Sequence, residues 1–181
     1  GGPCSGDSGH GCSNLTWMFE AALNAIGHAD TALRIILPLL EGELPLRVDP
    51  QQHAYAFQLA SDEGLNTLQA DAVAKAYSAE YVACIQGPPG TGKTKVLALA
   101  ARLMAERGER ILVTSHTHTA INHALGKIAS LGVPTVKIGN PNQARGLAPS
   151  VLQRDTFGEW EERPAPGGYV VGGTPLPTST R

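Results

Sequence analysis

The hydrophobic positions of this chain become regularly spaced from about residue 65 onward. Apolar residues at intervals of three and four alternate there with short, continuous apolar runs. The first spacing is typical of helices that bury one face, and the second of strands buried on both faces. The pattern predicts helices at residues 65–76, 93–107 and 120–131, and strands at residues 81–86, 110–114, 135–138 and 169–172.

Strands that alternate with helices predict an α/β fold with a parallel sheet and right-handed crossovers. Ligands of such sheets bind at the carboxyl ends of the strands. We expect this domain to occupy residues 62–181. The stretch at about residues 140–168 is polar and rich in Pro and Gly, so we interpret it as a surface insertion.

The chain before residue 62 follows a different pattern. Residues 1–13 are rich in Gly, Ser and Pro and are expected to be flexible; Cys4, His10 and Cys12 fit no common zinc spacing. Residues 14–61 are predicted to form a small accessory segment of helices and strands. It would contain a helix with Trp17, Met18, Leu23 and Ile26, a helical run from Asp30, and short strands at residues 44–48 and 54–59.

Composition limits the possible partners. Of 181 residues, 42% are hydrophobic and 17% charged, as expected of a globular chain with a sizeable core. The formal net charge is -2, so a nucleic-acid site would have to be a local groove. Three cysteines, with Cys84 in a predicted buried strand, indicate an intracellular compartment, most simply the cytoplasm. No apolar run has the length of a membrane helix, so no membrane partner is expected.

A phosphate-binding motif lies between a predicted strand and a predicted helix. Residues 85–94 read IQGPPGTGKT and fit the pattern G-x-x-x-x-G-K-[ST]. Glycines let backbone N–H groups surround phosphates, Lys93 adds a positive charge at the β- and γ-phosphates, and the Thr94 hydroxyl can bind Mg²⁺. Catalytic roles therefore fall to Lys93 and Thr94, with ATP and Mg²⁺ as cofactors. We assign nucleotide binding to Gly87, Pro88, Pro89, Gly90, Thr91, Gly92, Lys93, Thr94 and Lys95.

A second motif precedes the loop. Residues 65–73 read LNTLQADAV, and with the loop they resemble superfamily 1 helicases, in the group of the nonsense-mediated decay helicase and related DNA helicases. The resemblance covers about residues 65–180 and implies the front part of a RecA-like P-loop domain. In that family, ATP hydrolysis drives movement on single-stranded nucleic acid and duplex unwinding. The matching glutamine is Gln69, whose amide can pair with adenine; the alternative is a solvated glutamine on an amphipathic helix.

Residues 115–122, SHTHTAIN, look like motif Ia of the same family. Hydroxyl groups and exposed amides at a helix start suit the phosphates of a single strand. The resemblance assigns nucleic-acid contacts to Ser115, Thr117 and His118, and a short likeness to motif Ic adds Thr174. His118 stands where relatives commonly have Asn, and Asn122 where they often have Asp, which leaves the details of contact open.

Two other interpretations of this histidine-rich segment remain. Its histidines could be metal ligands, although no carboxylate or cysteine accompanies them. The polar residues could also cap a helix without binding anything. The three histidines concerned are His116, His118 and His123.

Hydrolysis in this family needs an acidic pair on a later strand and arginines from a second RecA-like domain. The pair Asp62-Glu63 precedes the loop and follows no suitable strand. We therefore expect a fragment of a longer helicase that binds nucleotide but hydrolyses almost none. The expected partners are a second RecA-like domain and single-stranded nucleic acid, with DNA favoured over RNA although the gripping residues do not report on the sugar.

Two further classes stay open. An AAA+ or other P-loop ATPase would place its acidic strand among residues 140–155, where no apolar run ends in Asp-Glu. A non-catalytic nucleotide-binding scaffold is the other alternative. Stimulation of ATP hydrolysis by single-stranded nucleic acid would distinguish a helicase from a scaffold.

Overall fold

The computed structural model describes residues 32–156 and 167–174, which divide into two compact units between Pro45 and Leu46. In the described part of the first unit, a single π turn, η1 (Ala32–Ile36), continues into helix α2 (Leu37–Leu40). Pro38 lies in the first turn of α2. The helix predicted around Trp17 lies outside the described residues.

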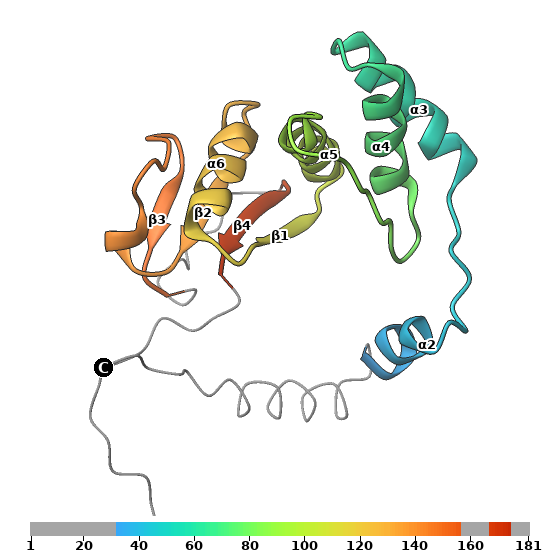
Figure 1. Cartoon of the computed structure of the whole chain (residues 1–181), viewed down its shortest axis with the longest axis horizontal. Helices are drawn as coiled ribbons and strands as arrows, with labels where there is room; N and C mark the ends of the chain where they lie inside the picture. The colour runs from blue at the N-terminus through green and yellow to red at the C-terminus, as the bar shows by residue number, and fades with distance from the viewer. Residues whose placement is uncertain (1–31, 157–166, 175–181) are drawn as a thin grey trace, which may run out of the picture. The chain divides into compact units, whose positions relative to one another are not determined.

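A four-stranded parallel sheet lies at the centre of the second unit (Figure 1). Its strands are β1 (Arg110–Thr114), β2 (Thr135–Ile138), β3 (Leu152–Arg154) and β4 (Tyr169–Gly173), in the spatial order β1-β4-β2-β3. Strand β4 pairs with β1 on one side and with β2 on the other. The predicted α/β fold with a parallel sheet is confirmed.

Two helices cover one face of this sheet. Helix α5 (Lys93–Glu106) and helix α6 (His118–Ala129) share a buried cluster with Val113 of β1 and Val170 of β4. The neighbours of Val170 along β4 point the other way and pack with Val136, as the two-residue period of a strand requires. Both helices were predicted from their apolar spacing and are confirmed. No described helix has the length and apolar sequence needed to cross a membrane.

A helical hairpin extends the core beyond α5. Helix α3 (Pro50–Asp62) packs on α4 (Thr67–Ser78), and α4 packs on α5 (Figure 1). Arg107, at the end of α5, donates to the Gln52 side chain at 2.6 Å and lies 4.4 Å from the centre of the Tyr77 ring. The buried residues of the hairpin are mainly small, which allows close helix packing: Ala56, Ala60, Ala70, Val73, Ala74 and Tyr77.

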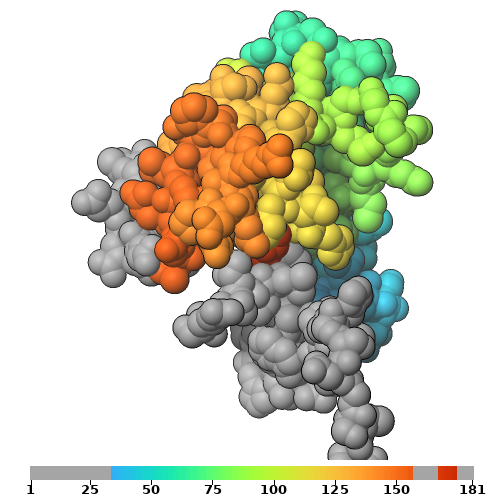
Figure 2. Space-filling view, turned by 60° about the vertical axis from the view of Figure 1, so that its left-hand side comes forward, coloured from blue at the N-terminus to red at the C-terminus, as the bar shows by residue number. Residues whose placement is uncertain are grey.

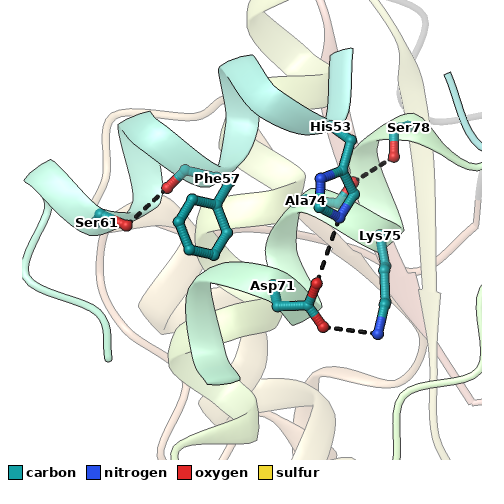
Figure 3. A network of polar contacts seen from close by, with 7 residues as sticks. All are labelled: His53, Phe57, Ser61, Asp71, Ala74, Lys75 and Ser78. Atoms are coloured by element: carbon teal, nitrogen blue, oxygen red, sulfur yellow. Dashed lines mark hydrogen bonds and ion pairs between the residues drawn. The ribbon is translucent and has the colours of Figure 1, made fainter. Parts of the chain in front are cut away.

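Polar contacts on one flank of the hairpin join its two helices (Figure 3). The Asp71 carboxylate contacts Lys75 Nζ at 2.6 Å and His53 Nε2 at 3.4 Å. His53 also stacks on Phe57, one turn along α3. The hydrogen bond from Lys75, together with the positive charges beside it, lowers the pKa of Asp71. This group of side chains therefore ties α3 to α4.

The prediction of strands at residues 44–48 and 54–59 is wrong. Residues 54–59 lie inside α3, and the first segment forms only a bridge between Val48 and Ala79. Asp49 explains the difference, because its carboxylate accepts from the N–H groups of Gln51 and Gln52 at 2.9 and 3.0 Å. Asp49-Pro50 is thus a helix start, with proline in the first turn, and not a turn between strands.

The prediction of a buried strand at residues 81–86 is also wrong. The segment pairs with no described strand, and its side chains are largely exposed, including Tyr81 at 42%, Ile85 at 40% and Cys84. An apolar run favours extended backbone, but a parallel strand exists only where a neighbouring strand supplies hydrogen bonds. Among the described strands, β1 is paired with β4 alone.

Two smaller differences concern the role of one segment and the buried face of one helix. The segment interpreted as a surface insertion contributes β3, which pairs in parallel with β2 and forms an edge of the sheet. In α4, Leu68 is 82% exposed, while the next apolar positions along the helix face inward. The apolar spacing predicted this helix, and Val73 is buried as such a spacing requires, but Leu68 is not.

Candidate nucleotide-binding site

The glycine-rich loop leads directly into α5. Gly90 and Gly92 have φ values of +81° and +80°, a left-handed conformation that side chains other than glycine rarely adopt. The Gly92 carbonyl accepts from the N–H groups of Lys95 and Val96 at 2.8 and 3.1 Å and so begins the helix. The N–H groups of Lys93 and Thr94 precede this bonding and have no partner carbonyl within the helix, so they can face an anion.

The ammonium group of Lys93 is held over this loop. Its Nζ donates to the carbonyl oxygens of Gly87 at 2.5 Å and Pro88 at 2.7 Å. Thr91 Oγ1 donates to the same Pro88 carbonyl at 2.8 Å. An ammonium has three donors, so one remains for a phosphate oxygen. Thr94 follows on the first turn of α5 and is half-buried.

Gln69 joins the start of α4 to the same loop. Its Oε1 accepts from the Asn66 N–H at 3.2 Å, while its Nε2 donates to the Thr91 carbonyl at 3.0 Å. The Asn66 side chain accepts from the Gln69 N–H in return, which completes a capping box. The alternative of a merely solvated glutamine does not match these contacts.

A pocket of about 350 Å³ lies between α4 and the loop, within the size range of small-ligand sites. Gln69 and Lys93 both line this pocket, so one ligand could meet an amide that suits a base and an ammonium that suits phosphates. No described carboxylate lines the pocket, so no negatively charged side chain in its lining repels an anion. The lining includes Asn66, Leu68, Gln69, Gly87, Thr91 and Lys93.

Lys95 lies apart from this pocket. Its ammonium donates to the Gly64 carbonyl at 3.3 Å and so ties α5 to the turn before α4. A second cleft, of about 380 Å³, contains Lys93 and Thr94 together with Thr114 and Ser115 at the end of β1. The structure thus brings the phosphate loop and the beginning of the motif Ia segment to one cleft.

The residues assigned to nucleic acid gather at the carboxyl edge of the sheet. Ser115 follows β1 and Thr174 follows β4, and these neighbouring strands end in register at Thr114 and Gly173. Thr117 caps α6, since its Oγ1 accepts from the Ala120 N–H at 3.3 Å. His118 is half-buried in the first turn of α6. No three His, Cys, Asp or Glu side chains of the described residues form a metal-binding group.

A buried polar cluster beneath this edge was not predicted. Lys137 of β2 is fully buried, and its Nζ donates to the Gln143 carbonyl at 2.5 Å. Asn122 of α6 donates to the same carbonyl at 3.0 Å and to the Arg145 carbonyl at 2.9 Å. A carboxylate in place of Asn122 could not donate to either carbonyl, which gives a physical reason for asparagine here.

This cluster attaches the chain after β2 to α6. Figure 2 shows the two lying side by side, the orange surface after β2 against the yellow and gold surface of α6 and the segment before it. Burial lowers the pKa of Lys137, and burial together with the Lys137 charge lowers the pKa of His118. The available sequence signal was a lysine between Val136 and Ile138, in a strand predicted to be buried on both faces.

Replacing Lys137 with methionine is expected to raise the free energy of unfolding at pH 7 by about 1 kcal/mol, because a buried ammonium is removed while Asn122 still bonds the Gln143 carbonyl. The pKa of Lys137 is lowered from 10.5, so the cost of burying its charge is present at low pH and disappears as pH rises to 10.5. The advantage of methionine should therefore shrink over that range. Urea unfolding at pH 7 and 10.5 measures the difference in stability between Lys137→Met and the parent. Lys127→Met, on the exposed side of α6, is the control. A Lys137→Met variant less stable than the parent at pH 7 would contradict this account.

A parallel α/β sheet with a glycine-rich loop at the start of α5 defines the core of a P-loop NTPase. A family model described as "AAA domain" matches residues 64–163. That match and the helicase relatives described next show that the chain belongs to this AAA domain family and to the superfamily 1 helicases.

Similar proteins are named as helicases. The chain is 37% identical over 83 residues to the DNA replication ATP-dependent helicase/nuclease DNA2 of Saccharomyces cerevisiae, covering 46% of this chain and 6% of that protein. It is 35% identical over 88 residues to the DNA polymerase alpha-associated DNA helicase A of Schizosaccharomyces pombe, which covers 49% of this chain and 13% of that protein. It is 32% identical over 91 residues to the DNA replication ATP-dependent helicase/nuclease DNA2 of Homo sapiens, which covers 50% of this chain and 8% of that protein.

The chain therefore spans only a small part of the length of the curated relatives it matches. No solved structure matches it significantly. The relatives favour a superfamily 1 helicase over other P-loop ATPases, and the predicted family is confirmed.

Proposed function

We propose that this chain binds Mg²⁺-ATP as part of the first motor domain of an ATP-dependent helicase. The observation that carries the proposal is the pocket between α4 and the phosphate loop, which both Gln69 and Lys93 line. The intact protein would act inside the cell with a second RecA-like domain.

Each site residue has a role in this proposal. Lys93 contributes positive charge to the β- and γ-phosphates and is held toward them by two loop carbonyls. Thr94 supplies a hydroxyl ligand for Mg²⁺, which would neutralise phosphate charge when bound. Gln69 keeps one free hydrogen on Nε2 and one free lone pair on Oε1, which match N7 and the N6 amino group of adenine.

The carboxyl edge of the sheet is proposed to hold single-stranded DNA. Ser115, Thr117, His118 and Thr174 lie on this edge, beside the start of α6. Hydroxyls and helix N-termini bind phosphates without reading sequence, as a motor that moves along a strand requires. The helicase names of the relatives support this assignment, and "DNA" in those names favours DNA over RNA.

Calorimetric titration of the 181-residue chain with Mg²⁺-ATP and Mg²⁺-GTP tests the nucleotide site. ATP is expected to bind, and GTP more weakly, because the free donor and acceptor of Gln69 match the adenine edge.

Fluorescence anisotropy with single-stranded DNA and RNA of one sequence tests the carboxyl edge of the sheet, and DNA is expected to bind more tightly. In the full-length protein, ATP hydrolysis should rise when single-stranded DNA is added. A chain that binds no nucleotide would overturn the proposal, and unstimulated hydrolysis would favour a scaffold.

A further inference from the structure

The Gln69 side chain touches the phosphate loop itself and not only the space for a base. Its Nε2 lies 3.0 Å from the Thr91 carbonyl oxygen. A Cβ built on Gly92 would lie 2.6 Å from the same nitrogen, so the glutamine amide packs directly against the loop backbone. Gln69 is therefore a contact between α4 and the part of the loop that surrounds phosphates.

The loop has little else to hold it at this point. Thr91 lies between two glycines in left-handed conformation, and its own N–H contacts the Pro88 carbonyl only at 3.5 Å. The Thr91 hydroxyl contacts that carbonyl too, but this bond stays within the loop. Lys93 of α5 bonds the Pro88 carbonyl at 2.7 Å, but among the described residues the hydrogen bond that reaches the Thr91 carbonyl from a helix is the one from Gln69. A loop with two glycines would otherwise lose much conformational freedom when it binds phosphate.

The bond to the loop does not compete with a base. A glutamine amide has two hydrogens and two lone pairs, and the protein uses one hydrogen at Thr91 and one lone pair at Asn66. The same side chain can hold the loop and still pair with adenine. Loss of the loop contact should then be detectable with a ligand that has no base.

We propose that Gln69 holds the phosphate loop in its binding shape and thereby strengthens binding of the triphosphate chain even without a base. This inference rests on the proposed nucleotide-binding function of the same pocket. It assigns Gln69 a positioning role toward phosphate, separate from the recognition of adenine.

Inorganic tripolyphosphate with Mg²⁺ is the ligand that separates the two roles. In calorimetric titration of the full 181-residue chain, Gln69→Met is expected to weaken tripolyphosphate binding about five-fold, the equivalent of one net hydrogen bond. ATP binding should weaken by a larger factor, about 20-fold, because contacts to the base are lost as well. Methionine keeps the length of the side chain, and Asn66 still caps α4 through the Gln69 N–H.

The matched control is Gln58→Met, because Gln58 is a glutamine of α3 that bonds Asp62 and lines no part of the pocket. Thermal unfolding of both variants shows whether the fold is retained. If Gln69→Met does not fold, Gln69→Glu replaces it, since a glutamate keeps the capping box but cannot donate to Thr91; Leu68→Glu then controls for the added charge. Unchanged tripolyphosphate binding with weakened ATP binding would overturn the inference and leave the proposed function standing. Failure of the parent chain to bind either ligand would overturn both.

Discussion

Replacing Lys93 with alanine is expected to lower the affinity of the chain for Mg²⁺-ATP by about 100-fold, because a charged donor to the phosphates is lost. The two carbonyls that now accept from Lys93, those of Gly87 and Pro88, would also face the phosphate chain without a cation between them. The loss should be similar for tripolyphosphate, since Lys93 acts on phosphate and not on the base.

Calorimetric titration of both ligands measures this effect. Lys127→Ala is the matched control, because Lys127 is an exposed lysine in the last turn of α6. Lys93 is exposed, so the thermal unfolding temperature of the variant should stay close to that of the parent. An affinity of the variant for Mg²⁺-ATP within about three-fold of the parent's would show that the Lys93 ammonium does not reach the phosphates.

Gly168→Ala is expected to have the largest effect on stability, a loss of about 3 kcal/mol in the free energy of unfolding. A Cβ at this position would lie 2.4 Å from both the Cα and the carbonyl oxygen of Ala105, and 2.5 Å from the Glu109 carbonyl oxygen. All three atoms are backbone, so no side chain can move aside. The Gly168 N–H also donates to the Ala105 carbonyl at 3.1 Å, which brings the chain into β4 beside the end of α5.

Urea unfolding of Gly168→Ala and Gly132→Ala separates close contact from backbone strain. Gly132 has a φ of +84° but open space around it, so alanine there should cost only about 1 kcal/mol. Equal losses for the two variants would contradict the role of the contact with Ala105. A soluble Gly168→Ala chain with the unfolding midpoint of the parent would do so more directly.

Much of the candidate site could be read from sequence because its chemistry is local. The loop, its glycines and Lys93 occupy adjacent positions, and the helix that follows them begins where the pattern predicts. The caps formed by Asn66 and Thr117 likewise depend on residues three positions apart. Such features require no knowledge of distant parts of the chain.

The errors arose where a local pattern has two structural outcomes. Residues 54–59 are apolar enough for a strand, but Asp49 and Pro50 begin a helix before them. Residues 81–86 have the composition of a buried strand and are exposed, because pairing partners come from elsewhere in the chain. Hydrophobic content alone could not decide either case.

By itself, then, the sequence determined the helices on either side of the phosphate loop and the chemistry of the loop, because spacing and capping act over a few residues. Only the tertiary structure decided that β4 inserts between β1 and β2, that Lys137 is buried under α6, and that Gln69 bonds the loop 22 residues further along the chain. The pairing of β4 and the bond from Gln69 join residues far apart in sequence. They form only when the core is assembled, since the free energy that orders them comes from burial of the whole domain.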